Sequence, residues 1–202
     1  MKMASSRRII KFFEMIIGSS LRGLGCGFLI VANIGGDPIT TFNTGLAKIF
    51  NLDNFWAFII TNLFFIILLL IFDRKKIGIG TIFSTYLISQ GVYFASILNF
   101  VASWNKYLVF GIAIIISGIG ISLYADANIG FSALDGFVFA MHEKIKIPIK
   151  VSKIGIDILF LVLGLCFGSK IGIGTIISLL LMGPLIEIFY KLISKLMRFN
   201  HV

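Results

Sequence analysis

The heptapeptide Lys76-Ile77-Gly78-Ile79-Gly80-Thr81-Ile82 occurs a second time, residue for residue, as Lys170-Ile171-Gly172-Ile173-Gly174-Thr175-Ile176. The match continues upstream, where Ala32-Asn33-Ile34-Gly35 is followed 95 residues later by Ala127-Asn128-Ile129-Gly130. The chain of 202 residues is therefore predicted to be one unit written twice. A unit of about 95 residues is too long for a solenoid repeat, but it has the size of half a membrane transporter.

The composition predicts an integral membrane protein that lies in a lipid bilayer. Hydrophobic residues make up 58% of the chain and charged residues only 13%, with a mean hydropathy of +1.02. A soluble domain needs more polar residues than this to cover its surface. Cys26 and Cys166 both fall inside apolar stretches at non-equivalent repeat positions, which predicts two buried packing residues and no disulfide.

The apolar stretches predict an all-α fold with six transmembrane helices, because each is long enough to cross a hydrocarbon core of about 30 Å. They cover residues 10–34, 55–72, 79–100, 108–124, 151–167 and 171–192. Residues 1–202 then form a single membrane domain, in which residues 10–100 are the first repeat and residues 108–192 the second. Two shorter amphipathic segments, 38–50 and 131–145, occupy matching positions and are too short to cross, so they are expected to be re-entrant or interfacial helices.

The basic residues predict the orientation of the two repeats. If the short segments do not cross, each repeat has three spans, and the odd number inverts the second repeat. Of the 18 basic residues, only Lys48, Lys106 and Lys170 then lie outside, and Arg22 lies within a span. All the others lie on the cytoplasmic side, as the positive-inside rule requires. The sequence therefore predicts inverted-topology three-span repeats with both termini in the cytoplasm.

Each repeat is interrupted after its first span, at residues 33–38 and 128–132. Gly35 and Gly130 permit backbone conformations that other residues resist, and Asp37 and Ser132 are expected to cap the short helices. Interrupted helices at corresponding positions indicate a transporter's substrate site, because their free ends can hold a solute or an ion. The candidate binding residues here are Asn33, Gly35 and Asp37 in the first half, and Asn128 and Gly130 in the second. The alternative is that both breaks are surface turns before interfacial helices.

Charged side chains within membrane segments are costly, so they mark further candidates. Arg22 lies near the middle of the first span, while Asp157 and Glu187 lie in the fifth and sixth spans. Arg22 is expected to neutralise one of these two carboxylates or to hold an anionic substrate; the alternative is a structural ion pair without a ligand. Asp135, beside the second break, is expected either to line the cavity or to lie on an exposed helix face.

Other chemistries find little support in the sequence. The two histidines, His142 and His201, lie apart and have no HExxH motif or cysteine partner, so no metal site, cofactor or enzymatic activity is expected. The net charge of +9 is explained by the cytoplasmic loops without nucleic acid as a partner. The Gly-Ile-Gly-Thr repeats lack the Gly-Lys-[Ser/Thr] ending of a phosphate-binding loop, and they are predicted to allow close helix packing.

The second half carries a resemblance to a known family. Its stretch 127–135, Gly172-Ile173-Gly174-Thr175 and the later segment 181–187 (Leu-Met-Gly-Pro-Leu-Ile-Glu) resemble the conserved segments of the bacterial YczE/YyaS/YitT-type membrane proteins, and Arg22 matches a family arginine. The chain departs from the family at Ala133-Leu134, where the family tends toward Pro-Trp. The resemblance implies a multi-spanning protein of the bacterial cytoplasmic membrane, of a family often presumed to transport solutes.

Two classes of function follow from these patterns. The first is a small secondary transporter or exporter of a small anionic or polar solute, with alternating access between the two repeats. The second is a non-transporting scaffold or regulatory protein, whose basic segment 144–153 and C-terminal tail contact a cytoplasmic partner or anionic lipid. A homo-oligomer is compatible with either class.

Overall fold

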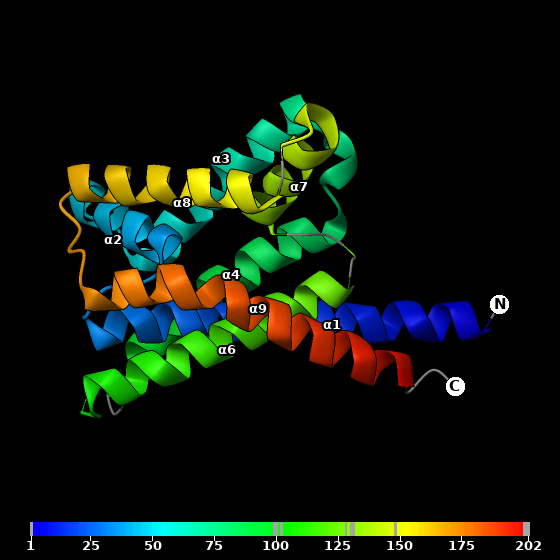
Figure 1. Cartoon of the computed structure of the whole chain (residues 1–202), viewed down its shortest axis with the longest axis horizontal. Coiled ribbons are helices and arrows are strands. Elements are labelled where there is room, and N and C mark those ends of the chain that lie inside the picture. The colour runs from blue at the N-terminus through cyan, green and yellow to red at the C-terminus, as the bar shows by residue number, and fades with distance from the viewer. Residues whose placement is uncertain are drawn as a thin grey trace.

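A computed structural model of the chain describes residues 2–98, 101, 103–127, 129, 132–147 and 149–199, and all regular structure within these ranges is helical. Figure 1 shows the helices packed as two layers, with the N- and C-termini at the same end of the molecule. In chain order the elements are α1 (Lys2–Ala32), α2 (Pro38–Phe50), α3 (Asn54–Phe72), the 3₁₀ turn η1 (Arg74–Lys76), α4 (Ile79–Ile97), α6 (Lys106–Ala127), α7 (Ala133–Ile145), α8 (Ile149–Cys166) and α9 (Ile173–Phe199).

Four helices in the described part of the chain are long and apolar enough to cross a membrane. They contain the segments Ile9–Ala32, Asn54–Phe72, Lys106–Ala127 and Ile173–Leu196. The other two predicted spans also form helices, α4 with 19 residues and α8 with 18. Neither is among the four: α4 carries several Ser, Thr and Gln residues, and α8 carries two lysines and an aspartate. The protein is therefore a helical membrane protein with four candidate spans.

The helices of the two halves pack in matching pairs. One layer holds α1, α4, α6 and α9, and the other holds α2, α3, α7 and α8 (Figure 1). In the first layer α1 packs on α4 as α6 packs on α9; in the second, α2 packs on α3 as α7 packs on α8. Between the halves, α2 lies on α8 as α7 lies on α3. The contact between α1 and α6 joins the two sets at the centre.

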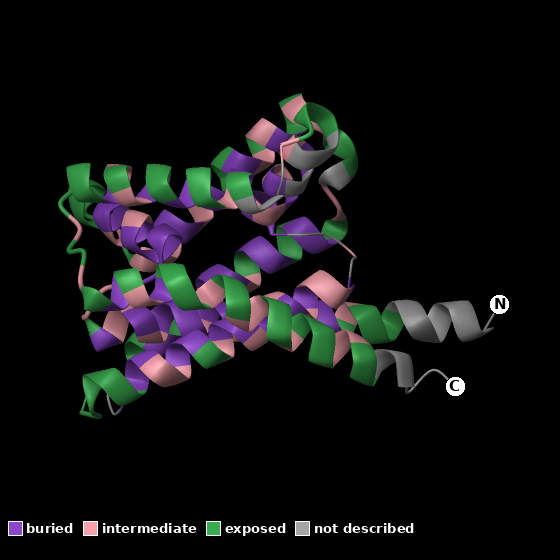
Figure 2. Cartoon of the chain, in the orientation of Figure 1, coloured by how far each residue is buried: buried purple, intermediate pink, exposed green. Residues whose placement is uncertain are grey.

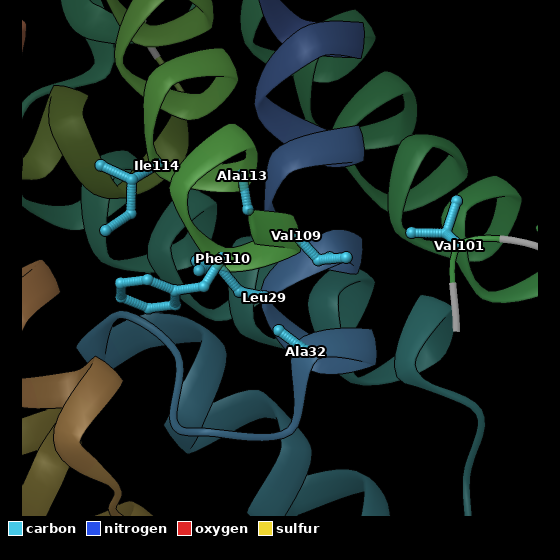
Figure 3. Close-up of a cluster of buried hydrophobic side chains, with 7 residues drawn as sticks. All are labelled: Leu29, Ala32, Val101, Val109, Phe110, Ala113 and Ile114. Atoms are coloured by element: carbon cyan, nitrogen blue, oxygen red, sulfur yellow. The ribbon is translucent and has the colours of Figure 1, made fainter. Parts of the chain in front are cut away.

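Small residues bring α1 and α6 into close contact along antiparallel axes. A Cβ added at Gly18 would lie 2.7 Å from the carbonyl oxygen of Gly120, and one added at Gly25 would lie 2.9 Å from that of Ala113. A buried cluster closes one end of this seam, where Leu29 and Ala32 of α1 meet Val109 and Phe110 of α6 (Figure 3). In a bilayer, where apolar burial does not drive association, such backbone approach supplies the packing energy.

The two short helices, α2 and α7, turn their apolar faces into the second layer. Ile39 of α2 and Leu134 and Val138 of α7 are buried in one cluster with side chains of α3 and α8, which confirms that both segments are amphipathic. Figure 2 shows buried residues along α1, α2, α4 and α6, while much of α8 and α9 is exposed. One expectation is wrong: Cys26 is buried, but Cys166 is exposed at the end of α8.

Candidate functional site

The first break is a sharp reversal between α1 and α2. Two residues have left-handed backbone conformations, Asn33 with a φ of 50° and Gly35 with a φ of 103°. Asn tolerates this region better than most side chains, and Gly adopts it without strain. Asp37 then caps α2 by accepting a hydrogen bond from the Thr40 amide at 3.0 Å, and Pro38 occupies the first turn. The expected cap is confirmed.

The reversal folds the start of α2 back against α1. Arg22 forms a salt bridge with Asp37, and both residues are more than nine-tenths buried. Arg22 precedes the end of α1 at Ala32 by ten residues, which is about 15 Å along a helix. Gly36, the residue before Asp37, lies against Leu29, so the start of α2 lies beside the last turns of α1 and the Arg22 side chain extends along α1 to reach it. The N-terminus of α2 is the first wall of the candidate site.

The predicted pairing of Arg22 with Asp157 or Glu187 is wrong. Asp157 is paired with Lys153, one turn away on α8, at 2.7 Å, and Glu187 is paired with Lys191 on α9 at 2.6 Å. Glu187 is on the exposed face of α9, so it stands apart from the site. Arg22 instead pairs with Asp37, the carboxylate that the break between α1 and α2 places beside it. Its second terminal nitrogen, Nη1, is buried and has no hydrogen-bond partner among the described residues.

The second copy of the repeated heptapeptide holds the first break in place. The Gly174 amide donates a hydrogen bond to the Ile34 carbonyl oxygen at 2.9 Å, and the Ser178 hydroxyl lies 3.3 Å from the Gly36 carbonyl oxygen. A side chain at Gly172 would collide with the Ile34 carbonyl group. For this copy the expected role in close packing is correct, but its backbone contact is with the break of the opposite half. The repeated heptapeptide was the signal that the sequence offered. The spacing of residues did not show that its second copy contacts the first break.

A cavity of about 620 Å³ opens beside the break. Its walls are the end of α1, the polar face of α2, the start of α3 and the turn between α8 and α9. Asn33 and Gly35 line it, together with Thr41, Lys48 and Lys170. The cavity therefore lies between the first half and the second, and it contains two of the predicted site residues and two lysines that the sequence reasoning did not select.

The corresponding region of the second half forms a separate polar cluster. The Asp135 carboxylate accepts hydrogen bonds from the hydroxyl of Tyr124 and, at 2.7 Å, from that of Ser132. The Ser132 hydroxyl also lies 3.4 Å from the Asp135 amide, as expected for the residue that caps α7. Asp135 is half-buried in this cluster. The candidates Asn128 and Gly130 lie outside the described residues.

Comparison with known proteins finds one matching family profile and two relatives that share most of the chain. The sequence profile of a family of unknown function, DUF6198, matches residues 9–191. The chain is similar to the uncharacterized protein YyaS of Bacillus subtilis, with 27% identity over 92% of this chain and 95% of that protein. It is also similar to an uncharacterized protein of Haemophilus influenzae, with 23% identity over 90% and 84%. These matches confirm the expected resemblance to the YyaS-type proteins. No solved structure matches the chain.

Proposed function

We propose that this chain, which belongs to the DUF6198 family of unknown function, is a small secondary transporter that moves a solute by alternating access between its two halves. One observation carries the proposal: the N-terminus of the short helix α2 meets the buried charge of Arg22 beside α1, within the length of that helix. Transporters place substrates where interrupted helices end within the membrane, because the free backbone groups and the helix dipole act there without competition from water.

In the proposed topology the chain crosses the cytoplasmic membrane of a bacterium six times, through α1, α3, α4, α6, α8 and α9. The antiparallel packing of α1 and α6 supports inverted three-span repeats, since these are the first spans of the two halves. The common end of the two termini supports a cytoplasmic location for both (Figure 1). Lys144 at the end of α7 also donates a hydrogen bond to the Phe72 carbonyl group beside η1, which joins two of the basic clusters.

In this topology the cavity faces outward, and its rim joins the two halves. The Lys48 ammonium donates to the Gly168 carbonyl oxygen at 3.1 Å, and the Ser169 hydroxyl donates to the Thr41 carbonyl oxygen at 2.6 Å. These bonds tie α2 of the first half to the turn between α8 and α9 of the second. Rocking of one half against the other would break and remake such contacts, while Arg22 and Asp37 stay at the pivot.

The test is solute flux through the purified chain in proteoliposomes. A panel of small organic anions, cations and neutral solutes is assayed by counterflow with the native chain, with Arg22→Ala and with Arg22→Lys. We expect flux of at least one solute that Arg22→Ala abolishes and Arg22→Lys retains in part. Lys191→Ala is the matched control, because its ion pair is exposed on α9 and lies apart from the site.

Folding is checked separately, since the loss of Arg22 leaves Asp37 buried without its partner. Each variant must elute as the native chain does in size-exclusion chromatography before its flux is interpreted. Flux equal to that of empty liposomes across the whole panel, with a folded native chain, would refute transport and favour the scaffold.

A further inference from the structure

The cavity between the two halves has an unbalanced charge. Lys48 and Lys170 line it, and none of its lining residues is an aspartate or a glutamate. Two carboxylates adjoin lining residues in the sequence: Asp37 is buried and already paired with Arg22, and Asp53, between Leu52 and Asn54, is exposed and does not line the cavity. Neither lysine has a carboxylate within ion-pair distance among the described residues. Two positive charges therefore face the cavity without a counter-charge from the lining.

The remaining lining groups suit a small organic molecule better than a bare ion. Asn33, Asn51 and Asn54 offer side-chain amides, while Leu29 and Leu52 supply apolar surface. The volume of about 620 Å³ is within the range of roughly 300–1,000 Å³ that small-molecule sites occupy. Such sites combine an apolar wall with a few polar groups that fix orientation. The cavity offers both.

A third positive group, Arg22, lies close to the lining of the cavity. Of the lining residues, Gly36 precedes Asp37 in the chain and Thr40 donates its amide hydrogen to the Asp37 carboxylate, which is paired with the buried Arg22. The Nη1 atom of Arg22 is buried without a hydrogen-bond partner among the described residues. An unsatisfied guanidinium nitrogen at this depth costs free energy that an anionic ligand or a water molecule recovers. The cavity thus has two lysines in its lining and a buried arginine close to that lining.

We propose that this cavity is the outward-facing binding site for a small organic anion, whose acidic group is neutralised by Lys48 and Lys170 and whose apolar body lies against Leu29 and Leu52. The inference rests on the proposed transport function for its role in the cell. The next step inward would be exchange of the anion onto the free nitrogen of Arg22. Carboxylates, sulfonates and phosphonates share the chemistry required.

The experiment measures ligand-dependent thermal stabilisation of the full chain in nanodiscs, with probes of matched size. Butyrate, propanesulfonate and propylphosphonate are the anionic probes, butyramide is the neutral probe, and butylamine is the cationic probe. We expect stabilisation by at least one anion and by neither of the other two. Neutralising one lysine is expected to weaken the apparent affinity about fivefold, and neutralising both about 25-fold, since each exposed charge contact contributes up to about 1 kcal/mol.

The variants separate charge from folding. Lys48→Gln and Lys170→Gln remove the charges singly and together, while Lys48→Arg and Lys170→Arg keep them and are expected to bind as the native chain does. Lys106→Gln is the matched control, because Lys106 does not line the cavity. Equal stabilisation by butyramide, no stabilisation by any anion, or full binding by the double glutamine variant would overturn the inference.

The binding assay tests the anion site and the flux assay tests transport, so the two proposals can fail independently of each other. Anion binding that depends on the two lysines but is accompanied by no flux would refute transport and leave the site standing. Flux of a cation or a neutral solute that depends on Arg22 and is unchanged in the double glutamine variant would keep transport and overturn the anion site.

Discussion

The Arg22–Asp37 pair is the feature whose energetics can be predicted most sharply. Both residues are more than nine-tenths buried, so each charge depends on the other for compensation. Replacing Arg22 by Met leaves the Asp37 carboxylate buried alone, and breaking a buried pair in this way costs about 3–5 kcal/mol. Asp37→Asn leaves the guanidinium alone, but the asparagine can still cap α2. We expect this change to destabilise by a similar or slightly smaller amount.

The double variant Arg22→Met/Asp37→Asn removes both charges, and its destabilisation should be well below the sum of the two single effects. We expect a coupling free energy of at least about 2 kcal/mol in a double-mutant cycle, which is within the range for residues in direct contact. The free energy of unfolding is measured by titrating the chain in mixed micelles with a denaturing detergent and following tryptophan fluorescence. The exposed pair of Glu187 and Lys191 is the control cycle, and no measurable coupling is expected there.

The result that refutes this reasoning is additivity. If the double variant is destabilised by the sum of the two single changes, then Arg22 and Asp37 are not partners in the folded chain. The placement of the start of α2 beside α1 would be refuted with them, because that contact defines it. If Asp37→Asn alone were neutral, the charge of Arg22 would have another compensating group, and the pair would not be the centre of the site.

Two further predictions concern packing and topology. Gly174→Ala should destabilise the chain by about 1–3 kcal/mol, because its Cβ would lie 2.5 Å from the Gly35 carbonyl oxygen. Gly111→Ala, with no atom within 4 Å of the added Cβ, should be neutral or stabilise α6 by up to about 1 kcal/mol in the same detergent titration. In a variant free of Cys26 and Cys166, Lys75→Cys should react with a membrane-impermeant maleimide only after the cells are permeabilised; labelling in intact cells would contradict the six-span topology.

Local signals in the sequence predicted the helices well. The bounds 38–50 match α2 at both ends, because Asp37 and Pro38 start the helix through a cap and a fixed φ, and the left-handed Asn51 ends it. The predicted spans likewise correspond to helices that differ from them mostly at their ends. Hydropathy could not decide whether α4 and α8 cross, since their polar residues are compatible both with a span that faces protein and with a helix outside the bilayer.

The site was only partly predictable, since its key contact depends on the direction in which the chain turns. Arg22 and Asp37 were both selected from the sequence, the first as a charge in a span and the second as a cap. Their pairing follows from the backbone of Gly35 and from the hydrogen bond that Gly174 gives to Ile34. Neither the Gly35 backbone conformation nor this hydrogen bond recurs at a regular spacing, so no periodic pattern in the sequence predicts the pairing. The lysines of the cavity escaped selection because they lie near helix ends, where basic residues are common.

Gly172 and Gly174 of the second half contact the first break closely. This contact limits how a duplicated chain can change during evolution and whether its two halves can be expressed separately. A segment of the second half completes the backbone hydrogen bonds of the first, so each half contains part of what folds the other. Positions 34–35 and 172–174 should then covary among relatives. Two halves expressed as separate polypeptides should be degraded singly and accumulate only together, as obligate fragments of one fold.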